Sequence, residues 1–163
     1  TRRQKADGRQ ILPCGWARVG KSRMSITNKA NDTNKSQKRA GEKVIYADLS
    51  YKIMNAVFEV HNQLGPGFTE SIYERALVVE LENRNIAFEA QKEIEIVYKE
   101  QKLGKYRLDL LVEEKIIVEL KAVAGLNDLF KQQLLSYLRA TDLKLGILVN
   151  FGEERVQYIR ITN

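Results

Sequence analysis

Two carboxylates and a lysine stand in stretches that otherwise resemble buried β-strands. Asp109 lies within the run 106–112, and Glu119 and Lys121 lie within 116–122; both runs are rich in β-branched and apolar residues. An unpaired carboxylate costs several kcal/mol to bury, and two carboxylates close together repel each other. Such a cluster persists most readily where a cation compensates it.

Oxygen ligands from Asp109 and Glu119 suit Mg²⁺ or Mn²⁺, which keep several waters and take one or two protein carboxylates while a substrate phosphate supplies the rest. Lys121 would then steady the attacking water or the negative charge that develops on phosphorus. The alternative is an edge-strand salt bridge between Lys121 and either acid, because an acid followed two residues later by lysine is common by chance. On the triplet alone, both interpretations stay open.

Strand geometry sets a condition on this cluster. Alternate residues of a strand share a face, so Glu119 and Lys121 project together. In an antiparallel hairpin, Asp109 lies directly opposite Glu119 only when Val112 pairs with Ile116, which leaves a three-residue loop, one of the common hairpin lengths. A two-residue turn without a bulge would separate the two acids onto opposite faces. We therefore predict the three-residue loop, or a bulge with the same effect.

The rest of the chain predicts the elements that must position these residues. Apolar side chains at helical spacing indicate a helix that ends at 65–67 and a second helix that Thr69 or Ser71 can cap. Ser71 with Glu74 would make a capping box. Later segments follow as three strands, a helix and two strands, over 87–98, 104–112, 116–121, 127–140, 144–151 and 155–161. The predicted class is α/β, with the first three strands as a meander.

Two of these helices carry polar residues that would join the strand cluster. Glu70 stands at the start of the second helix, where the simplest role of an acid is to stabilise the helix dipole, by a few tenths of a kcal/mol up to about 1. Gln133 and Tyr137 share one face of the third helix, where core packing around a satisfied amide is the simplest role. The combination of the three with the strand cluster points to a shared site.

Together these residues resemble the GxxExxY family, a group of small bacterial and archaeal proteins assigned to the PD-(D/E)xK nuclease-like superfamily. Gly67, Glu70 and Tyr73 match the motif that names the family. The resemblance covers about residues 48–163, and its most similar segments are 106–122, 133–138 and 146–152.

The resemblance implies an αβββαβ core, here with an extra N-terminal helix. It implies that acids hold Mg²⁺ or Mn²⁺, that a lysine aids the attacking water, and that a glutamine and a tyrosine line the site. The implied metal ligands are Asp109, Glu119 and Glu70, and the implied catalytic residues are Glu70, Asp109, Glu119, Lys121, Gln133 and Tyr137. Phe130 departs from the pattern, because the family often has a histidine there, three residues before the glutamine.

We therefore expect metal-dependent phosphodiester hydrolysis on nucleic acid, either DNA or RNA. The alternative is a non-catalytic module that keeps the nuclease-like fold and binds nucleic acid or a protein. The distribution of charge argues against binding of nucleic acid by the domain alone. The net charge of +6 arises from residues 1–44, whereas 45–163 hold 15 Lys and Arg against 18 Asp and Glu. A nuclease offers basic groups to phosphates, so a local basic patch or the N-terminal segment would have to compensate.

Residues 1–43 are basic, and the polar composition of 27–41 offers too little apolar surface to offset the entropy of ordering it. We predict a disordered tail there and one domain over 44–163. Residues 15–22 match the phosphate-binding pattern GxxxxGK[ST]. A working loop of that kind needs a buried strand before it and a helix after it, and the flanking sequence supports neither.

The remaining features narrow the class of protein. The sequence has no apolar run long enough for a membrane span and no secretory signal pattern, so we expect a cytoplasmic protein. Cys14 is the only cysteine and therefore forms no disulfide within the chain. His61 is the only histidine, and its place near the end of a predicted helix favours capping or exposure over a catalytic role.

Overall fold

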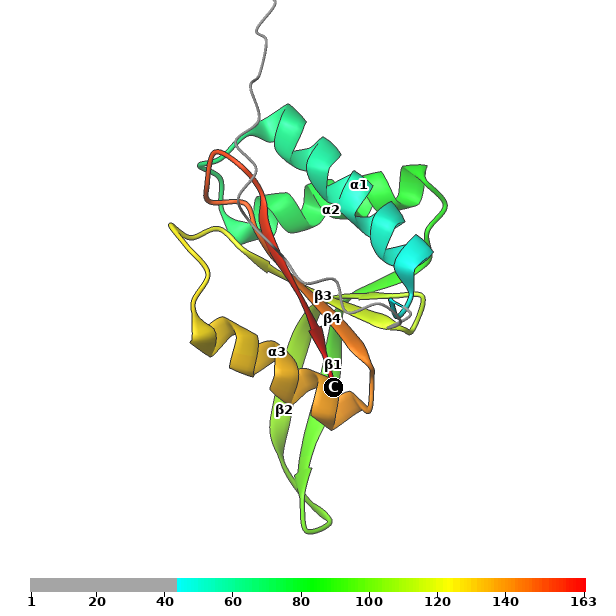
Figure 1. Cartoon of the computed structure of the whole chain (residues 1–163). Helices are drawn as coiled ribbons and strands as arrows, with labels where there is room; N and C mark the ends of the chain where they lie inside the picture. Colours follow the sequence, from blue (N-terminus) through cyan, green and yellow to red (C-terminus); the bar gives the residue numbers. More distant parts are fainter. Residues whose placement is uncertain (1–43) are drawn as a thin grey trace, which may run out of the picture. The chain divides into compact units, whose positions relative to one another are not determined.

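The computed structural model describes residues 44–163, and the elements follow the predicted order of two helices, three strands, a helix and two strands (Figure 1). The predicted tail, 1–43, and the phosphate-loop-like segment, 15–22, lie outside the described residues. No helix within 44–163 is long and apolar enough to cross a membrane. The elements are α1 Ala47–Leu64, α2 Glu70–Asn83, β1 Phe88–Tyr98, β2 Gln101–Val112, β3 Ile116–Lys121, α3 Asp128–Thr141, β4 Leu145–Asn150 and β5 Gln157–Thr162.

The strands form one sheet in the order β1-β2-β3-β4-β5. The pairs β1–β2 and β2–β3 are antiparallel, so the predicted meander is confirmed. β4 runs parallel to β3, and α3 makes the crossover that a parallel pair requires. β5 then pairs antiparallel with β4 and ends the sheet. The structure thus has the predicted mixed α/β class.

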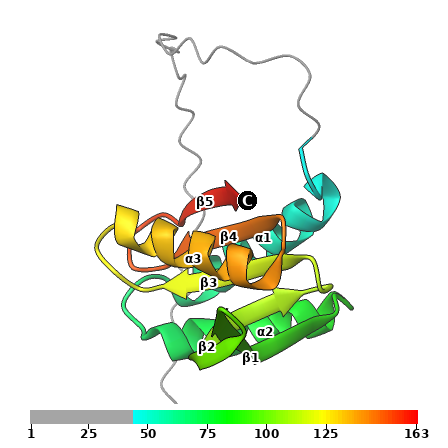
Figure 2. The same ribbon diagram turned by 90° about the horizontal axis from the view of Figure 1, so that it is seen from below.

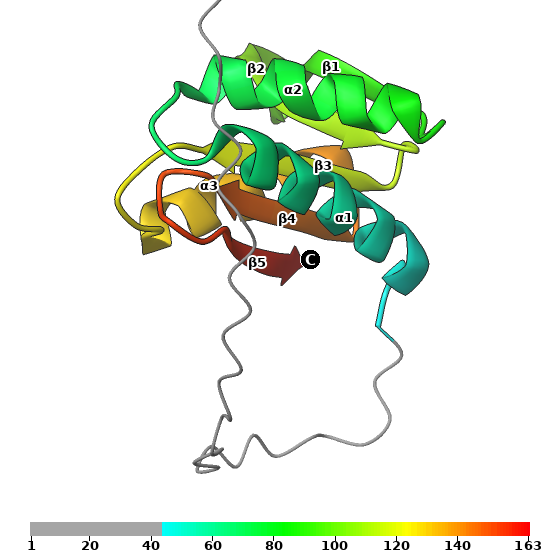
Figure 3. The same ribbon diagram turned by 90° about the horizontal axis from the view of Figure 1, so that it is seen from above.

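Helices cover both faces of the sheet: α1 and α2 lie on one face and α3 lies on the other (Figures 2 and 3). Each face has its own apolar core. The first core lies under α1 and α2 and includes Ile53, Tyr73, Leu77, Val118, Leu120 and Phe151. The second core lies under α3 and contains Ile94, Leu108, Leu111, Ile117, Leu134, Tyr137, Leu138 and Leu148.

The loop between β2 and β3 has the predicted length. Val112 pairs with Ile116, so three residues connect the strands. The paired ladder ends at Leu110 and Val118, one residue before Asp109 and Glu119. The condition that the sequence set for bringing the two acids together is met.

The β1–β2 hairpin departs from simple alternation. Leu110 and Val112 belong to the first core, whereas Leu108 belongs to the second, although a period of two would put all three on one face. Opposite this change, Gln91 in β1 has a φ of 55°. Asp109 lies where the hairpin turns from one face to the other. The outer half of the hairpin then extends alongside α3 (Figure 1).

The start of α2 resolves the two predicted caps. Thr69 occupies the N-cap position without a side-chain capping hydrogen bond, and Glu70 lies in the first turn, as predicted for this N-cap. The capping box between Ser71 and Glu74 does not form, because Ser71 lies inside the helix. The Glu74 carboxylate accepts a hydrogen bond from Gln91 Nε2 at 2.6 Å. The helix therefore uses its second acid to contact the sheet.

Candidate active site

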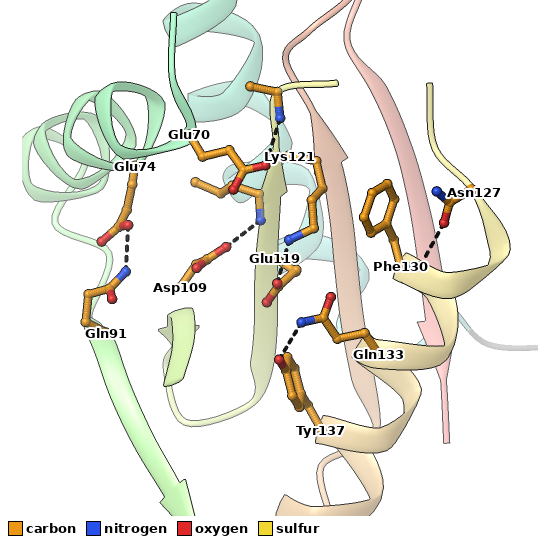
Figure 4. Close-up of polar contacts among 12 residues, drawn as sticks. Glu70, Glu74, Gln91, Asp109, Glu119, Lys121, Asn127, Phe130, Gln133 and Tyr137 are labelled. Atoms are coloured by element: carbon orange, nitrogen blue, oxygen red, sulfur yellow. Dashed lines mark hydrogen bonds and ion pairs between the residues drawn. The ribbon is translucent and has the colours of Figure 1, made fainter. Parts of the chain in front are cut away.

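β3 turns its two charged side chains toward α3. Leu120 points into the first core, and Glu119 and Lys121 project from the opposite face (Figure 4). Both are buried, with 3% of Glu119 and 9% of Lys121 exposed. Lys121 Nζ donates to Glu119 Oε1 at 2.8 Å. The pair satisfies the charge of the lysine and one oxygen of the glutamate.

Asp109 adds a second acid to this face. It is half-buried in β2, just beyond the last paired residues of the β2–β3 ladder, Leu110 and Val118. Its Oδ2 accepts from the backbone N–H of Leu120 at 2.8 Å (Figure 4). Where the strands part, this hydrogen bond fixes the carboxylate beside Glu119.

Burial and a neighbouring acid disfavour the ionisation of Glu119. Burial, followed by the charge of Asp109, raises the pKa of Glu119 to about 7, against the hydrogen bond from Lys121. Burial also raises the pKa of Asp109, against the hydrogen bond from Leu120. Burial works to lower the pKa of Lys121, but the hydrogen bond and charge of Glu119 lead the contributions that outweigh it, and the pKa is raised. The charge of Lys121 therefore partly compensates two neighbouring carboxylates, those of Asp109 and Glu119.

One oxygen of this cluster has no partner. Glu119 Oε2 is buried and accepts no hydrogen bond, and among the buried side-chain atoms of 44–163 only Ser50 Oγ shares that condition. Because buried polar atoms are almost always paired, such an atom marks a place for a missing group. Carboxylate oxygens are the ligands that Mg²⁺ and Mn²⁺ prefer. The donor set thus fits the predicted type of metal.

Glu70 reaches the end of β3 from α2. Its Oε1 accepts from the backbone N–H of Ala122 at 3.3 Å (Figure 4), and its charge helps to raise the pKa values of Asp109 and Glu119. Within residues 44–163, no three His, Cys, Asp or Glu side chains converge into a group that could hold a metal ion. The predicted three-ligand set is therefore not assembled in this structure, in which Glu70 accepts from the Ala122 amide.

The residues around Glu70 explain how this side chain is positioned at the end of β3. Tyr73 is fully buried, its ring stacks on Phe151 with centroids 4.5 Å apart, and its hydroxyl donates to Gly65 O at 2.7 Å. Gly67 has a φ of 112°, a conformation that favours glycine. Gly67 and Tyr73 therefore shape the loop before α2, and this loop sets the position of Glu70.

Gln133 and Tyr137 approach the acids from α3. Gln133 Nε2 donates to Tyr137 Oη at 2.6 Å, and both side chains point toward Glu119 (Figure 4). Tyr137 also packs in the second core. Burial raises the pKa of its hydroxyl, and the charge of Glu119 adds to the increase. The ring thus serves the core while the hydroxyl faces the polar cluster.

Phe130 stands where the resemblance to the GxxExxY family implies a histidine. Its ring centroid lies 5.5 Å from Lys121 Nζ, within the range of a cation–π contact. Phe130 is also packed against the second core. This position thus supports the lysine by an aromatic face and supplies no titratable group.

His61 lies apart from these residues. It is on α1, on the other face of the sheet, and its Nε2 is 2.9 Å from Glu153 O. Its ring stacks on Phe151. His61 is therefore buried and packed, so the capping or exposure favoured from the sequence is wrong.

The sequence pattern did not single out Asn150, which anchors the chain just beyond β3. Asn150 is fully buried, its Oδ1 accepts from Val123 N at 2.9 Å, and its Nδ2 donates to Val123 O at 2.8 Å. Gly152 permits this approach, because a Cβ there would collide with the Val123 backbone. In the sequence, the feature that could have identified Asn150 is its position as the one amide residue in the otherwise apolar run 145–150.

Glu74 is a second residue that the sequence pattern left out. Its charge contributes to the raised pKa of Asp109, and its carboxylate contacts Gln91 from α2 (Figure 4). The signal was its spacing, because residues four apart on a helix share a face, and Glu70 is four residues earlier. Glu74 therefore extends the acidic character of the site.

Residues 47–161 match the family model described as the PD-(D/E)XK nuclease superfamily. Among solved structures, the chain is similar to the one titled "Crystal structure of SSO0001", with 25% sequence identity and a TM-score of 0.48. The similarity covers 71% of this chain, and it spans 58% of the length of that one. No curated protein matches the chain.

The family match runs from α1 to β5 and includes all the candidate residues on both faces. The mixed sheet, with helices on both of its faces, is consistent with a nuclease-like core. The narrower resemblance to the GxxExxY family stays a prediction. By the extent of the family match, the chain belongs to the PD-(D/E)XK nuclease superfamily.

Proposed function

We propose that the domain hydrolyses phosphodiester bonds of nucleic acid with the help of Mg²⁺ or Mn²⁺. The observation that carries the proposal is the buried, unpartnered Oε2 of Glu119, which lies in a cluster with Asp109 and Lys121. Membership of the nuclease superfamily supports nuclease-like activity. The superfamily is also generally dependent on divalent metals, which agrees with the donor set.

In this proposal, Asp109 and Glu119 hold the metal. Glu119 offers its free Oε2, and Asp109 offers the oxygen that does not accept from Leu120. Glu70, at the end of β3, acts as an acidic ligand or orients a water molecule. When bound, the metal would supply positive charge that offsets the acids and polarises the phosphate.

Lys121 would stabilise the negative charge that develops on phosphorus. Its raised pKa keeps the amine charged at neutral pH, so the lysine acts as an electrostatic group and not as a general base. Tyr137 would orient the phosphate, since its oxygen accepts from Gln133 and its own proton stays available to donate. The α3 pair thus positions the substrate opposite the acids.

A non-catalytic module that keeps the nuclease-like fold is the second candidate. It is favoured by the contacts already made within the cluster: Lys121 pairs with Glu119, and Asp109 accepts from Leu120. Such contacts are also what a structural salt bridge would show. The two candidates differ in whether the acids bind metal and support cleavage.

The test is cleavage by the purified full chain with Mg²⁺ or Mn²⁺, on single-stranded and duplex DNA and RNA. We expect Asp109→Ala and Glu119→Gln each to reduce the rate by about 10²–10³-fold, the typical loss when a group that stabilises the transition state is removed. Glu82→Gln, at an exposed acid near the end of α2, is the matched control and should cleave normally. No cleavage with either metal, or equal cleavage by the site variants, would refute the proposal.

A further inference from the structure

A groove lies between the outer half of the β1–β2 hairpin and α3. Its volume is about 540 Å³, within the range of about 300–1,000 Å³ that is usual for ligand pockets. Ile96 and Tyr106 line it from the hairpin, and Leu129, Gln132, Gln133 and Tyr137 line it from α3. The groove exists because the hairpin changes face at Asp109 and extends alongside the helix (Figure 1).

The groove is continuous with the candidate active site. Gln133 and Tyr137 line the groove and also point toward Glu119 (Figure 4). The rings of Tyr106 and Tyr137 lie 5.5 Å apart between centroids, at an interplanar angle of 52°. A group seated against Tyr106 would therefore lie next to the residues proposed to orient the phosphate.

The lining combines flat apolar surface with amide groups. Tyr106 is 54% exposed and Leu129 is 71% exposed, and Gln132 is exposed as well. An exposed aromatic ring stacks on a nucleobase, with little regard to which base it is. The Gln132 amide both donates and accepts, as does the edge of a base. The chemistry of the groove therefore matches an unpaired base.

Net charge does not select the occupant of the groove. Residues 88–112, which form the hairpin, carry five Lys and Arg against five Asp and Glu. Four of the five bases are paired with glutamates: Lys92, Lys102, Lys105 and Arg107. Recognition in the groove therefore rests on its aromatic and amide groups.

We propose that this groove binds an unpaired nucleobase next to the scissile phosphate, so that the substrate is single-stranded nucleic acid. A base within a duplex is stacked on both sides and paired along its edge, so it cannot offer a free face to Tyr106. The inference rests on the proposed function for the place of the scissile bond. Binding of the base itself does not require cleavage, and the two ideas can be tested separately.

The test measures affinity by fluorescence anisotropy, with the full chain carrying Glu119→Gln to prevent cleavage. On this background, Tyr106→Ala should weaken binding of a short labelled single strand by about tenfold, and Tyr106→Phe should bind normally. Tyr51→Ala, at a 70% exposed tyrosine on α1, is the matched control and should have no effect. A strand of the same length with abasic sites should bind about tenfold less tightly and should no longer respond to Tyr106→Ala.

The abasic strand makes the outcomes distinct. Equal weakening of intact and abasic strands by Tyr106→Ala, or no weakening of either, would overturn the base groove. So would tighter binding of a duplex than of a single strand, or binding of peptides or a second copy of the chain without nucleic acid. If the unmodified chain cleaves nothing, but Tyr106→Ala weakens binding of the intact strand alone, the base groove stands and the proposed hydrolysis fails.

Discussion

The two faces of β3 have different roles. Val118 and Leu120 face the first core, where they are buried among apolar side chains from α1 and α2. Glu119 and Lys121 face α3, where one oxygen has no partner and two acids share one lysine. The apolar face therefore stabilises the fold, and this stability offsets the cost of burying the charged cluster on the other face.

The largest effect on stability should come from the face toward the first core. Leu120→Ala removes a side chain that is 1% exposed and should lower the free energy of unfolding by about 3 kcal/mol. Its neighbour variant, Glu119→Gln, should leave the stability of the metal-free protein unchanged or higher, because it removes one of two repelling acids. Urea unfolding followed by circular dichroism measures both. Equal destabilisation by the two variants would show that the α3 face is structural.

The next effect is a dependence of stability on pH. The pKa of Glu119 is about 7 in the folded state, above its ordinary 4.5. Below pH 4.5 both states are protonated and stability is full; between 4.5 and 7 only the folded state keeps the proton, so stability falls as pH rises. The fall should be on the order of 3 kcal/mol and complete above pH 7.

The measurement compares unfolding at pH 5 and pH 8, in EDTA, for the unmodified chain and for Glu119→Gln. The difference between the two proteins isolates this carboxyl from exposed acids such as Glu93, whose pKa the hydrogen bond from Lys105 lowers. We expect the variant to lose the extra destabilisation at pH 8. An identical pH dependence in both proteins would contradict the raised pKa.

The smallest effect concerns a residue that links the two faces. Tyr73 packs in the first core, and its hydroxyl holds the loop that sets the position of Glu70. Tyr73→Phe keeps the ring on Phe151 but removes that hydrogen bond, so the free energy of unfolding should fall by about 1 kcal/mol. Tyr51→Phe, at an exposed site, is the control. Loss of cleavage without loss of stability would place the Tyr73 hydroxyl in the site itself.

Local patterns were sufficient to predict much of this architecture. The element order follows from runs of apolar residues and their breaks, and the β2–β3 register follows from the loop length that brings Asp109 opposite Glu119. The opposite orientations of Leu120 and Glu119 need only the alternation of a strand. These features depend on residues close together in the sequence.

The features that were not predicted depend on contacts between distant segments. The hairpin changes face at Asp109, where Leu108 and Leu110 pack in different cores, and simple alternation does not describe this change. Glu74 contacts Gln91, a residue 17 positions away in β1, and forms no capping box. Asn150 anchors Val123 because the parallel pairing of β3 and β4 brings their ends together. The spacing of residues in the sequence does not predict these long-range contacts.

In the proposed function, the α3 face of β3 binds a divalent metal. Calorimetric titration of Mn²⁺ into the full chain tests it most directly, with Asp109→Ala and Glu119→Gln as comparisons and Glu82→Gln as the control. We predict saturable binding by the unmodified chain and by Glu82→Gln, and none by the two site variants. Absence of binding by the unmodified chain, or the same affinity in Asp109→Ala, would contradict the account.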